Sequence, residues 1–515
     1  MEKVCNSKLL RSLKDRNDFT LTFELVPGPG GRTRQHTRIL NLAKEIAADG
    51  RFRALSITEN AGGHPALTPE ALGAEIQTKG SEVIIHLSCK DKNRNQMESL
   101  LFGWDRLNLC NLLVVAGDYP KKGYLGHPKP VFDLDTVQAL DLLGAMNRGL
   151  TMNVKAGPTA KLQSASFLKG VVVSPFKFLE SELMMQYYKL HRKVAAGADF
   201  VITQIGYDAR KFHELLLYMK QNRLDIPVLG NVFIPNLPVM ELMHQGKIPG
   251  CVITEALYRQ IRQEAQAADQ GKEARLLRAA KLLAILKGLG YGGAHIGGPG
   301  LTFADLDFVL NTAATLEQRW QACIDDVSFW PDEAFWYFTK DSSSGLNTDQ
   351  PQIRPDRNKG IYPGYLLNRF IHNQAFAPDG LIYRPMKTMC LAFDKGRQNN
   401  ILCRVEHTAK AAFFGCQNCG DCTLAELAYL CPQDGCAKYL LNGPCGGSRD
   451  GWCEVYPGSK RCLYVKIYER LKSCGLEETL DEGFVPPRDW ALNNSSSWIN
   501  FFSGRDHLGW NKKKG

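Results

Sequence analysis

The chain alternates between short apolar runs and longer stretches in which apolar residues recur at helical spacing. From about residue 20 to residue 300, each run is rich in β-branched residues and each longer stretch has the pattern of an amphipathic helix. The eight runs cover residues 20–25, 53–58, 82–87, 111–116, 169–174, 199–204, 226–232 and 292–297. Eight strands with helices between them predict an α/β fold, a (β/α)8 TIM barrel. An open doubly wound sheet is the competing arrangement.

The helical stretches support this prediction. Residues 274–286 carry one apolar stripe suited to packing on a barrel wall, formed by Leu276, Leu277, Ala280, Leu283 and Ala284. Gly288 follows this stripe and is predicted to cap the helix. Another predicted helix, through residues 183–194, ends at Gly197, after which the chain resumes as a strand.

The alternation stops after residue 315, which predicts four segments. The barrel is expected to occupy residues 1–315, followed by a linker or wrapping segment over 316–399. A small cysteine-rich domain that binds a metal or a cluster is expected over 400–475, and a C-terminal tail over 476–515.

Composition excludes several classes of protein. Hydrophobic residues make up 44% of the 515 residues and no apolar run reaches roughly 18 residues, so we expect no membrane span. The first residues have no apolar core after their charges, so we expect no signal peptide and a cytoplasmic location. The net charge of +10 is spread along the chain, which suits an anionic small molecule, and without aromatic-basic interleaving we expect no nucleic-acid partner.

Cysteines dominate the C-terminal region. Eight of the sixteen cysteines lie close together: Cys416, Cys419, Cys422, Cys431, Cys436, Cys445, Cys453 and Cys462. The C-x2-C-x2-C opening is typical of ferredoxin-type clusters, whereas zinc ribbons use two separate C-x2-C pairs. Eight thiolates are enough for two [4Fe-4S] clusters; zinc is the alternative, and a disulfide framework does not suit a reducing compartment.

Polar residues follow or end six of the predicted strands. They are Glu24, Thr58, His86, Asp118, Ser174 and Gln204. Because the carboxyl ends of barrel strands form the active face, these are the candidate site residues. The apolar surroundings of Glu24 are expected to raise its pKa and make it a general acid. His86 is equally consistent with a hydrogen-bonded core histidine and with a ligand contact.

Several of these motifs together resemble the methylenetetrahydrofolate reductase family. They are Phe23-Glu24, His86-Leu-Ser-Cys, Gly117-Asp118 and the block Arg192-Lys193-Val-Ala-Ala-Gly-Ala-Asp-Phe-Val-Ile-Thr-Gln204. The similarity covers most of residues 15–310, and the last block is its most specific part.

The resemblance implies that a reduced flavin passes a hydride to methylenetetrahydrofolate and gives methyltetrahydrofolate. It makes Glu24 the acid that opens the imidazolidine ring, places Asp118 beside the pterin and flavin, and assigns folate binding to Gln204. The residues implied to hold the flavin are Thr58, His86, Gly117, Asp118, Arg192 and Lys193. The sequence departs from the family at Ala116, where an arginine is expected, and at Ser174, where a tyrosine is expected. These two departures leave the type of flavin open: FAD is expected from the resemblance, and FMN is the alternative.

The C-terminal region resembles the cysteine-rich extension, or partner subunit, found beside this reductase in anaerobes. The resemblance is carried by Leu441-Asn-Gly-Pro-Cys445-Gly-Gly after the three-cysteine opening. It implies electron supply other than direct NADH, with a folate or related pterin as substrate, an electron-donor protein or partner subunits, and an oligomer. Two alternatives stay open: an NAD(P)H-dependent reductase whose zinc module only assembles partners, and a folate-using barrel methyltransferase without flavin.

Overall fold

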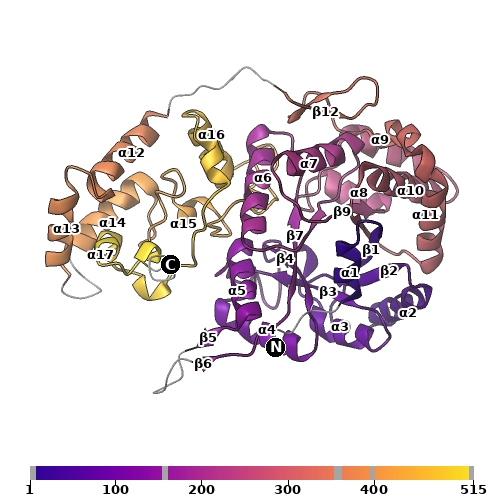
Figure 1. Cartoon of the computed structure of the whole chain (residues 1–515), viewed down its shortest axis with the longest axis horizontal. Coiled ribbons are helices and arrows are strands. Elements are labelled where there is room, and N and C mark those ends of the chain that lie inside the picture. The colour runs from indigo at the N-terminus through magenta and orange to yellow at the C-terminus, as the bar shows by residue number, and fades with distance from the viewer. Residues whose placement is uncertain (1–6, 153–159, 353–361, 395–400, 510–515) are drawn as a thin grey trace.

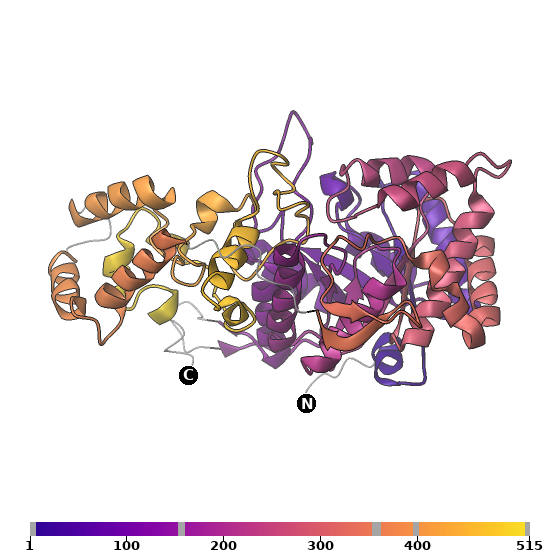
Figure 2. The same cartoon turned by 90° about the horizontal axis from the view of Figure 1, so that it is seen from above.

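The computed structural model describes residues 7–152, 160–352, 362–394 and 401–509 (Figure 1). Its first part is a closed barrel of eight parallel strands with helices around it. The second part is helical and cysteine-rich. Seen from above, the two parts lie side by side, and α6 of the barrel packs against α16 of the second part (Figure 2).

The predicted barrel is confirmed strand by strand. The strands are β1 (Thr20–Leu25), β2 (Phe52–Ile57), β3 (Val83–Ser88), β4 (Asn111–Val115), β7 (Leu168–Val173), β8 (Phe200–Thr203), β9 (Val228–Phe233) and β10 (Gly293–Gly297). Around the barrel they follow the order β1-β10-β9-β8-β7-β4-β3-β2, so every neighbouring pair is parallel and the sheet has no free edge. The open-sheet alternative is excluded. Two short strands, β5 (Thr151–Met152) and β6 (Ala160–Lys161), form a separate antiparallel pair.

Helices connect the strands and cover the outside of the barrel. They are α1 (Lys8–Lys14), α2 (Arg34–Asp49), α3 (Pro69–Gln77), α4 (Arg94–Arg106), α5 (Thr136–Arg148), α6 (Glu180–Ala195), α7 (Ala209–Gln221), α8 (Leu237–His244), α9 (Glu255–Glu264), α10 (Lys272–Leu289) and α11 (Phe303–Leu316). Within the described residues, no helix is both long and apolar enough to cross a membrane.

The predicted helix cap at Gly288 is wrong. Helix α10 continues one residue beyond Gly288, to Leu289, and Gly290 caps it with φ 91°. Gly288 is needed for packing instead, since a Cβ there would lie 2.3 Å from the Trp320 ring. Leu277, assigned to the buried stripe, is 36% exposed and lies at the edge of that stripe.

The barrel interior is apolar at its base and polar toward the strand carboxyl ends. Leu9 of α1 packs into the base against inward-facing residues such as Ile84 and Phe200. Gly170 makes room for Phe200, whose ring would lie 2.3 Å from a Cβ at that position. The next layer contains buried polar side chains, including Thr22, Ser56, His86 and His295. Polar groups inside a barrel are costly unless they are hydrogen-bonded, so this layer indicates a site.

Residues after α11 wrap back over the barrel. The hairpin of β11 (Phe338–Lys340) and β12 (Asn347–Pro351) packs against α7. A buried ion pair anchors the wrap: Lys211 donates to Glu214 at 2.7 Å and to the Phe335 carbonyl at 2.9 Å, while Glu214 accepts from the Tyr337 amide at 2.6 Å. Neither charged side chain is exposed.

The cysteine-rich part is framed by helices. They are α12 (Pro363–Phe376), α13 (Tyr383–Ala392), α14 (Ile401–Phe414), α15 (Pro432–Gly435), α16 (Leu463–Lys472) and α17 (Ser497–Phe502). The segment 316–399, predicted as a linker or wrap, therefore divides in two. Its first half wraps the barrel, and its second half supplies two helices that stand with the cysteine-rich part (Figure 1).

Lys211→Met is expected to lower the free energy of unfolding by about 3–5 kcal/mol, because it leaves the Glu214 carboxylate buried without its cation. Chemical denaturation followed by fluorescence measures this change. Lys287→Met, which breaks the largely exposed pair with Glu317, is the matched control and is expected to cost less than about 1 kcal/mol. Equal effects of the two variants would contradict the analysis.

Candidate functional site

Glu24 and His295 face each other at the strand ends of the barrel. The Glu24 carboxylate lies 3.6 Å from Nε2 of His295, and Nδ1 of His295 is 2.8 Å from the Thr22 hydroxyl. Adjacent strands β1 and β10 bring the two residues together, since Thr22 is opposite His295 in their register. His295 is 2% exposed, whereas the Glu24 side chain is 22% exposed and can be reached from the mouth of the barrel.

The predicted direction of the Glu24 pKa shift is wrong. Burial acts to raise the pKa of Glu24, but the hydrogen bond and charge of His295, with a smaller contribution from His86, hold it below its ordinary value. The sequence showed the apolar neighbours of Glu24 along the chain but not the histidine on the neighbouring strand. Glu24 and His295 therefore form a pair that can share a proton at the barrel mouth.

His86 lies inside the barrel as a hydrogen-bonded histidine. Its Nε2 is 2.8 Å from the Ser56 hydroxyl, and burial lowers its pKa to about 4, so the ring is neutral near pH 7. Among the residues that the structure describes, three polar atoms on or just after barrel strands are buried without a hydrogen-bond partner: Oγ1 of Thr58, Oγ of Ser174 and Oδ1 of Asn231. Buried polar atoms of this kind are normally satisfied, so these three fit a polar ligand at the mouth.

Asp118 and Gly117 follow β4 and organise the rim. Asp118 accepts a hydrogen bond of 2.7 Å from the Gly62 amide and so fixes the loop after β2. Gly117 has φ 84°, and a Cβ there would lie 2.2 Å from the Ser88 hydroxyl, so glycine is required by the backbone itself. Gln204, after β8, accepts from the Ile205 amide at 2.9 Å and leaves its amide nitrogen beside Gly250.

Arg192 and Lys193 lie apart from this group, on the last turn of α6 beneath the cysteine-rich part. Lys193 is buried and donates to the Val172 carbonyl at 2.5 Å. Arg192 is 9% exposed, and its Nε has no hydrogen-bond partner. One turn earlier, Lys189 donates to the carbonyls of Gly443 at 3.2 Å and Pro444 at 2.8 Å. The structure thus separates this cationic helix end from the residues at the barrel mouth.

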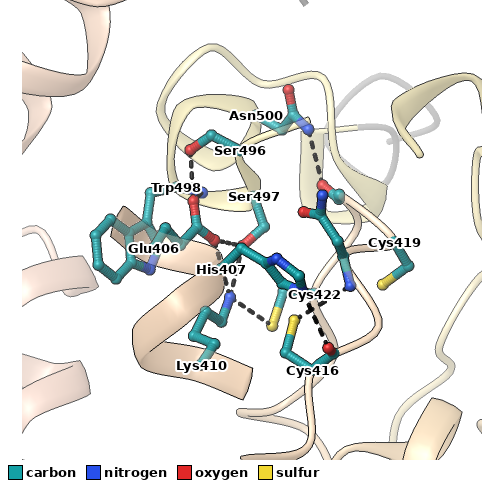
Figure 3. A network of polar contacts seen from close by, with 12 residues as sticks. Glu406, His407, Lys410, Cys416, Cys419, Cys422, Ser496, Ser497, Trp498 and Asn500 are labelled. Carbon is teal, nitrogen blue, oxygen red and sulfur yellow. Dashed lines mark hydrogen bonds and ion pairs between the residues drawn. The ribbon is translucent and has the colours of Figure 1, made fainter. Parts of the chain in front are cut away.

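The eight clustered cysteines form two sets of four. The outer set, Cys416, Cys419, Cys422 and Cys431, lines one cavity between α14, α15 and the chain before α17. Figure 3 shows three of these thiols beside Glu406, His407 and Lys410 of α14. Amide hydrogen bonds to sulfur are present here, since the Asn418 amide donates to Cys416 at 3.4 Å.

Two cations face the outer set. Lys410 donates to Cys422 at 3.3 Å, and also to Glu406 at 3.0 Å and Ser497 at 2.7 Å (Figure 3). Arg488 is 5% exposed, lines the same cavity, and its Nε has no hydrogen-bond partner. A buried guanidinium normally faces an anion, so the cavity suits a negatively charged group held by thiolates.

The barrel-side set is Cys436, Cys445, Cys453 and Cys462. Burial raises the pKa of Cys445 to about 12, and the Glu454 charge adds to this shift. Burial is also the largest cause that raises the pKa of Cys462, and the charges of Cys445 and Cys436 add to it; Cys453 adds to the raised pKa of Cys436 in the same way. Backbone amides of Lys438 and Leu440 oppose the shift by hydrogen-bonding to Cys436. Thiols whose pKa is raised in this way become thiolates near pH 7 only beside a cation.

The two sets and the barrel mouth are contiguous. Cys431 and Cys436 stand at the two ends of α15, which is a single turn, so roughly 8 Å of helix separates their Cα atoms. Lys438, two residues after Cys436 of the barrel-side set, donates to the Gly117 carbonyl at 2.7 Å. Tyr119, next to Asp118, makes a side-chain hydrogen bond with Tyr456 of the cysteine-rich part.

Sequence reasoning missed His295, Asn231, Lys438 and Arg488. The first two had a signal, because alternate residues of a barrel strand face inward and both lie on such positions of β9 and β10. The other two had none, because each acts on a group far away along the chain. In the described ranges, no group of three or more His, Cys, Asp or Glu side chains is arranged to hold a metal ion.

Comparison with known proteins agrees with this architecture. A family model described as methylenetetrahydrofolate reductase matches residues 9–285, and one described as methylene-tetrahydrofolate reductase C terminal matches residues 396–491.

Two solved structures are each similar to about three fifths of this chain. One is an uncharacterized protein from Clostridium thermocellum described as binding two copies of 5-methyl-5,6,7,8-tetrahydrofolic acid, with 13% identity, a TM-score of 0.41, and coverage of 61% of this chain and 99% of that one. Another is 2,3-dimethylmalate lyase, with 14% identity, a TM-score of 0.32, and coverage of 62% and 88%. At these TM-scores the likenesses carry no argument about function. The first family model spans more than half of the chain, and the protein therefore belongs to the methylenetetrahydrofolate reductase family.

Proposed function

We propose that this protein reduces 5,10-methylenetetrahydrofolate to 5-methyltetrahydrofolate with a flavin in the barrel, and that electrons reach the flavin through iron-sulfur clusters on the two cysteine sets. The family supports a folate substrate. The observation that carries the electron route is the contact between Lys438 and Gly117, which places the barrel-side set against the rim that holds Asp118.

The residues at the barrel mouth fit a flavin and a pterin. Thr58, Ser174 and Asn231 offer unpaired polar atoms, and Asp118 and Gln204 lie on the same rim. A flavin accepts electrons one at a time and delivers them as a hydride, so it suits a site between an iron-sulfur donor and a folate. Arg192 and Lys193 lie under the cysteine-rich part, and we assign them no contact with the isoalloxazine ring.

Glu24 handles the proton in this proposal. Opening the five-membered ring of the substrate breaks the bond between its methylene carbon and one nitrogen, and that nitrogen takes up a proton. Glu24 is reachable from the mouth and receives the proton from His295 behind it, which Thr22 orients through Nδ1. The methylene carbon then accepts the hydride and becomes the methyl group.

The cysteine sets fit clusters better than zinc. Tetrahedral zinc holds its thiolates at about 2.3 Å, which requires four sulfurs crowded around one point. The described cysteines form no such group, yet four of them line a common cavity with two cations beside it. A four-iron cluster is larger, carries negative charge with its thiolates, and commonly accepts amide hydrogen bonds at sulfur.

Glu24→Gln is expected to leave flavin binding and dithionite reduction unchanged while lowering folate reduction about a hundredfold to ten-thousandfold, the usual contribution of a general acid. Anaerobic single-turnover absorbance measures both steps on the same sample. Glu45→Gln on α2, at an exposed position outside the site, is the matched control. Normal turnover by Glu24→Gln would remove this residue from the acid role.

His295→Asn is expected to shift the pH profile upward. The pKa of Glu24 is held down by His295, so removing this partner raises that pKa and keeps the carboxyl protonated to a higher pH. The pH above which kcat/KM declines should therefore rise, even though the rate itself falls. A profile that stays in place or moves to lower pH would show that Glu24 does not govern this limb.

Cys445→Ala is expected to halve the iron content, from about eight to about four atoms per chain, because it removes one ligand of the barrel-side set only. Iron and zinc quantification on anaerobically purified protein measures this. Cys323→Ala, which changes a buried cysteine outside both sets, should keep the full iron content. Stoichiometric zinc in place of iron would instead support the zinc-module alternative.

A further inference from the structure

A groove borders the outer cysteine set at Cys431. It has a volume of about 560 Å³ and lies between α12, the end of α14, α15 and α16. Cys431 and Gly435 lie along it, so the groove reaches a ligand of the outer set directly. In Figure 1, α12 and α14 lie at the end of the molecule opposite α2 and α11, and α16 lies between them and α6 of the barrel.

One wall of the groove is apolar and unusually exposed. Phe413 at the end of α14 is 82% exposed, and Leu367 of α12 is 58% exposed. Ile371, one turn after Leu367, continues the same face of α12 and is half exposed. Contiguous exposed apolar side chains of this size mark an interaction surface more often than a solvated one.

The opposite wall is basic. It is lined by four cationic side chains, Lys460, Arg461, Lys466 and Arg470. Asp434 is the acidic residue among the described residues that line the groove. Arg461 pairs with Glu469 at 2.9 Å and Arg470 donates to the Ala428 carbonyl at 3.0 Å, whereas Lys466 is exposed. The wall is therefore positively charged beside Cys431, and this charge attracts a negatively charged partner.

We propose that this groove docks a small acidic electron-transfer protein, which passes electrons to the outer set. The proposal rests on the proposed function, since it places the entrance of that electron route. Three observations select the occupant: the groove reaches Cys431, its basic wall favours an acidic surface, and its exposed apolar wall offers a contact surface beside that charge. A second copy of the chain fits poorly, because each copy carries a net charge of +10 and presents the same basic wall.

The test uses the double variant Phe413→Ser with Lys466→Glu in the full-length protein. A reduced acidic two-cluster ferredoxin is the probe. The ferredoxin concentration that gives the half-maximal rate of methyltetrahydrofolate formation should be about tenfold or more higher for the double variant than for the unaltered protein. Added salt should slow the ferredoxin-driven reaction of the unaltered protein. Lys44→Glu, the same charge change at an exposed position of α2, is the matched control and should behave like the unaltered protein.

Reduced methyl viologen, a small donor that needs no docking surface, separates this proposal from the proposed function. Equal viologen-driven rates in all variants, with the ferredoxin defect confined to the groove variant, would support the groove. Three results would overturn it: an equal ferredoxin response in the groove variant and the Lys44 variant, no response of the unaltered protein to ferredoxin while viologen works, or a dimer in solution that the groove variant dissociates. Failure of viologen to drive the reaction in unaltered protein would instead overturn the proposed function.

Discussion

Buried hydrogen bonds join charged side chains of the barrel to backbone groups of one loop of the cysteine-rich part, and the arrangement of the two parts depends on them. Asp135, the N-cap of α5, accepts hydrogen bonds from the Leu441 amide at 3.1 Å and from the Asn442 amide at 2.7 Å. Lys177 donates to the carbonyls of Gly446 and Ser448, each at 2.6 Å, and Lys189 donates to Gly443 and Pro444. The three charged barrel residues are at most 3% exposed. Asp135 also accepts from the Val137 and Gln138 amides of its own helix, but all three charged groups make further hydrogen bonds to the loop, so the loop helps to satisfy charges that are buried in the folded chain.

The same hydrogen bonds also fix the position of the barrel-side set relative to the barrel. The loop from Leu441 to Ser448 contains Cys445, so the barrel charges that hold the loop also position the barrel-side set. Glu182 adds a further anchor by accepting from the Gly451 amide at 3.0 Å. The barrel and the loop that carries Cys445 are thereby joined by several hydrogen bonds, an arrangement that the proposed electron transfer requires.

The barrel itself changes character along its axis. Its base is filled by Leu9 and the apolar residues around Phe200, which give stability without chemistry. Toward the mouth, Thr22 and Ser56 satisfy His295 and His86 by hydrogen bonds, so the histidines tolerate burial. Glu24 and His295 therefore stand beside this hydrogen-bonded layer on strands β1 and β10, and neither lies on a loop.

The sequence by itself determined the elements and the identity of most candidate residues. The alternation of short β-branched runs with helical stretches located all eight barrel strands, because barrel strands are covered on both faces and therefore form nearly continuous apolar runs. The ends of those strands then identified Glu24, Thr58, Asp118 and Gln204 without further information. The close spacing of the cysteines predicted the second region, since such spacing is typical of a domain that binds a metal or a cluster.

Only the tertiary structure decided how these elements act on one another. The pKa of Glu24 is lowered by His295, which is distant in sequence but lies on the adjacent strand, and the eight cysteines divide at α15 into two sets that no spacing rule separates. The closeness of Lys438 to Gly117 likewise arises from packing of two parts of the chain. Electrostatic effects depend on distance through space, whereas a sequence records only distance along the chain, and for this reason the site's chemistry had to be read from the fold.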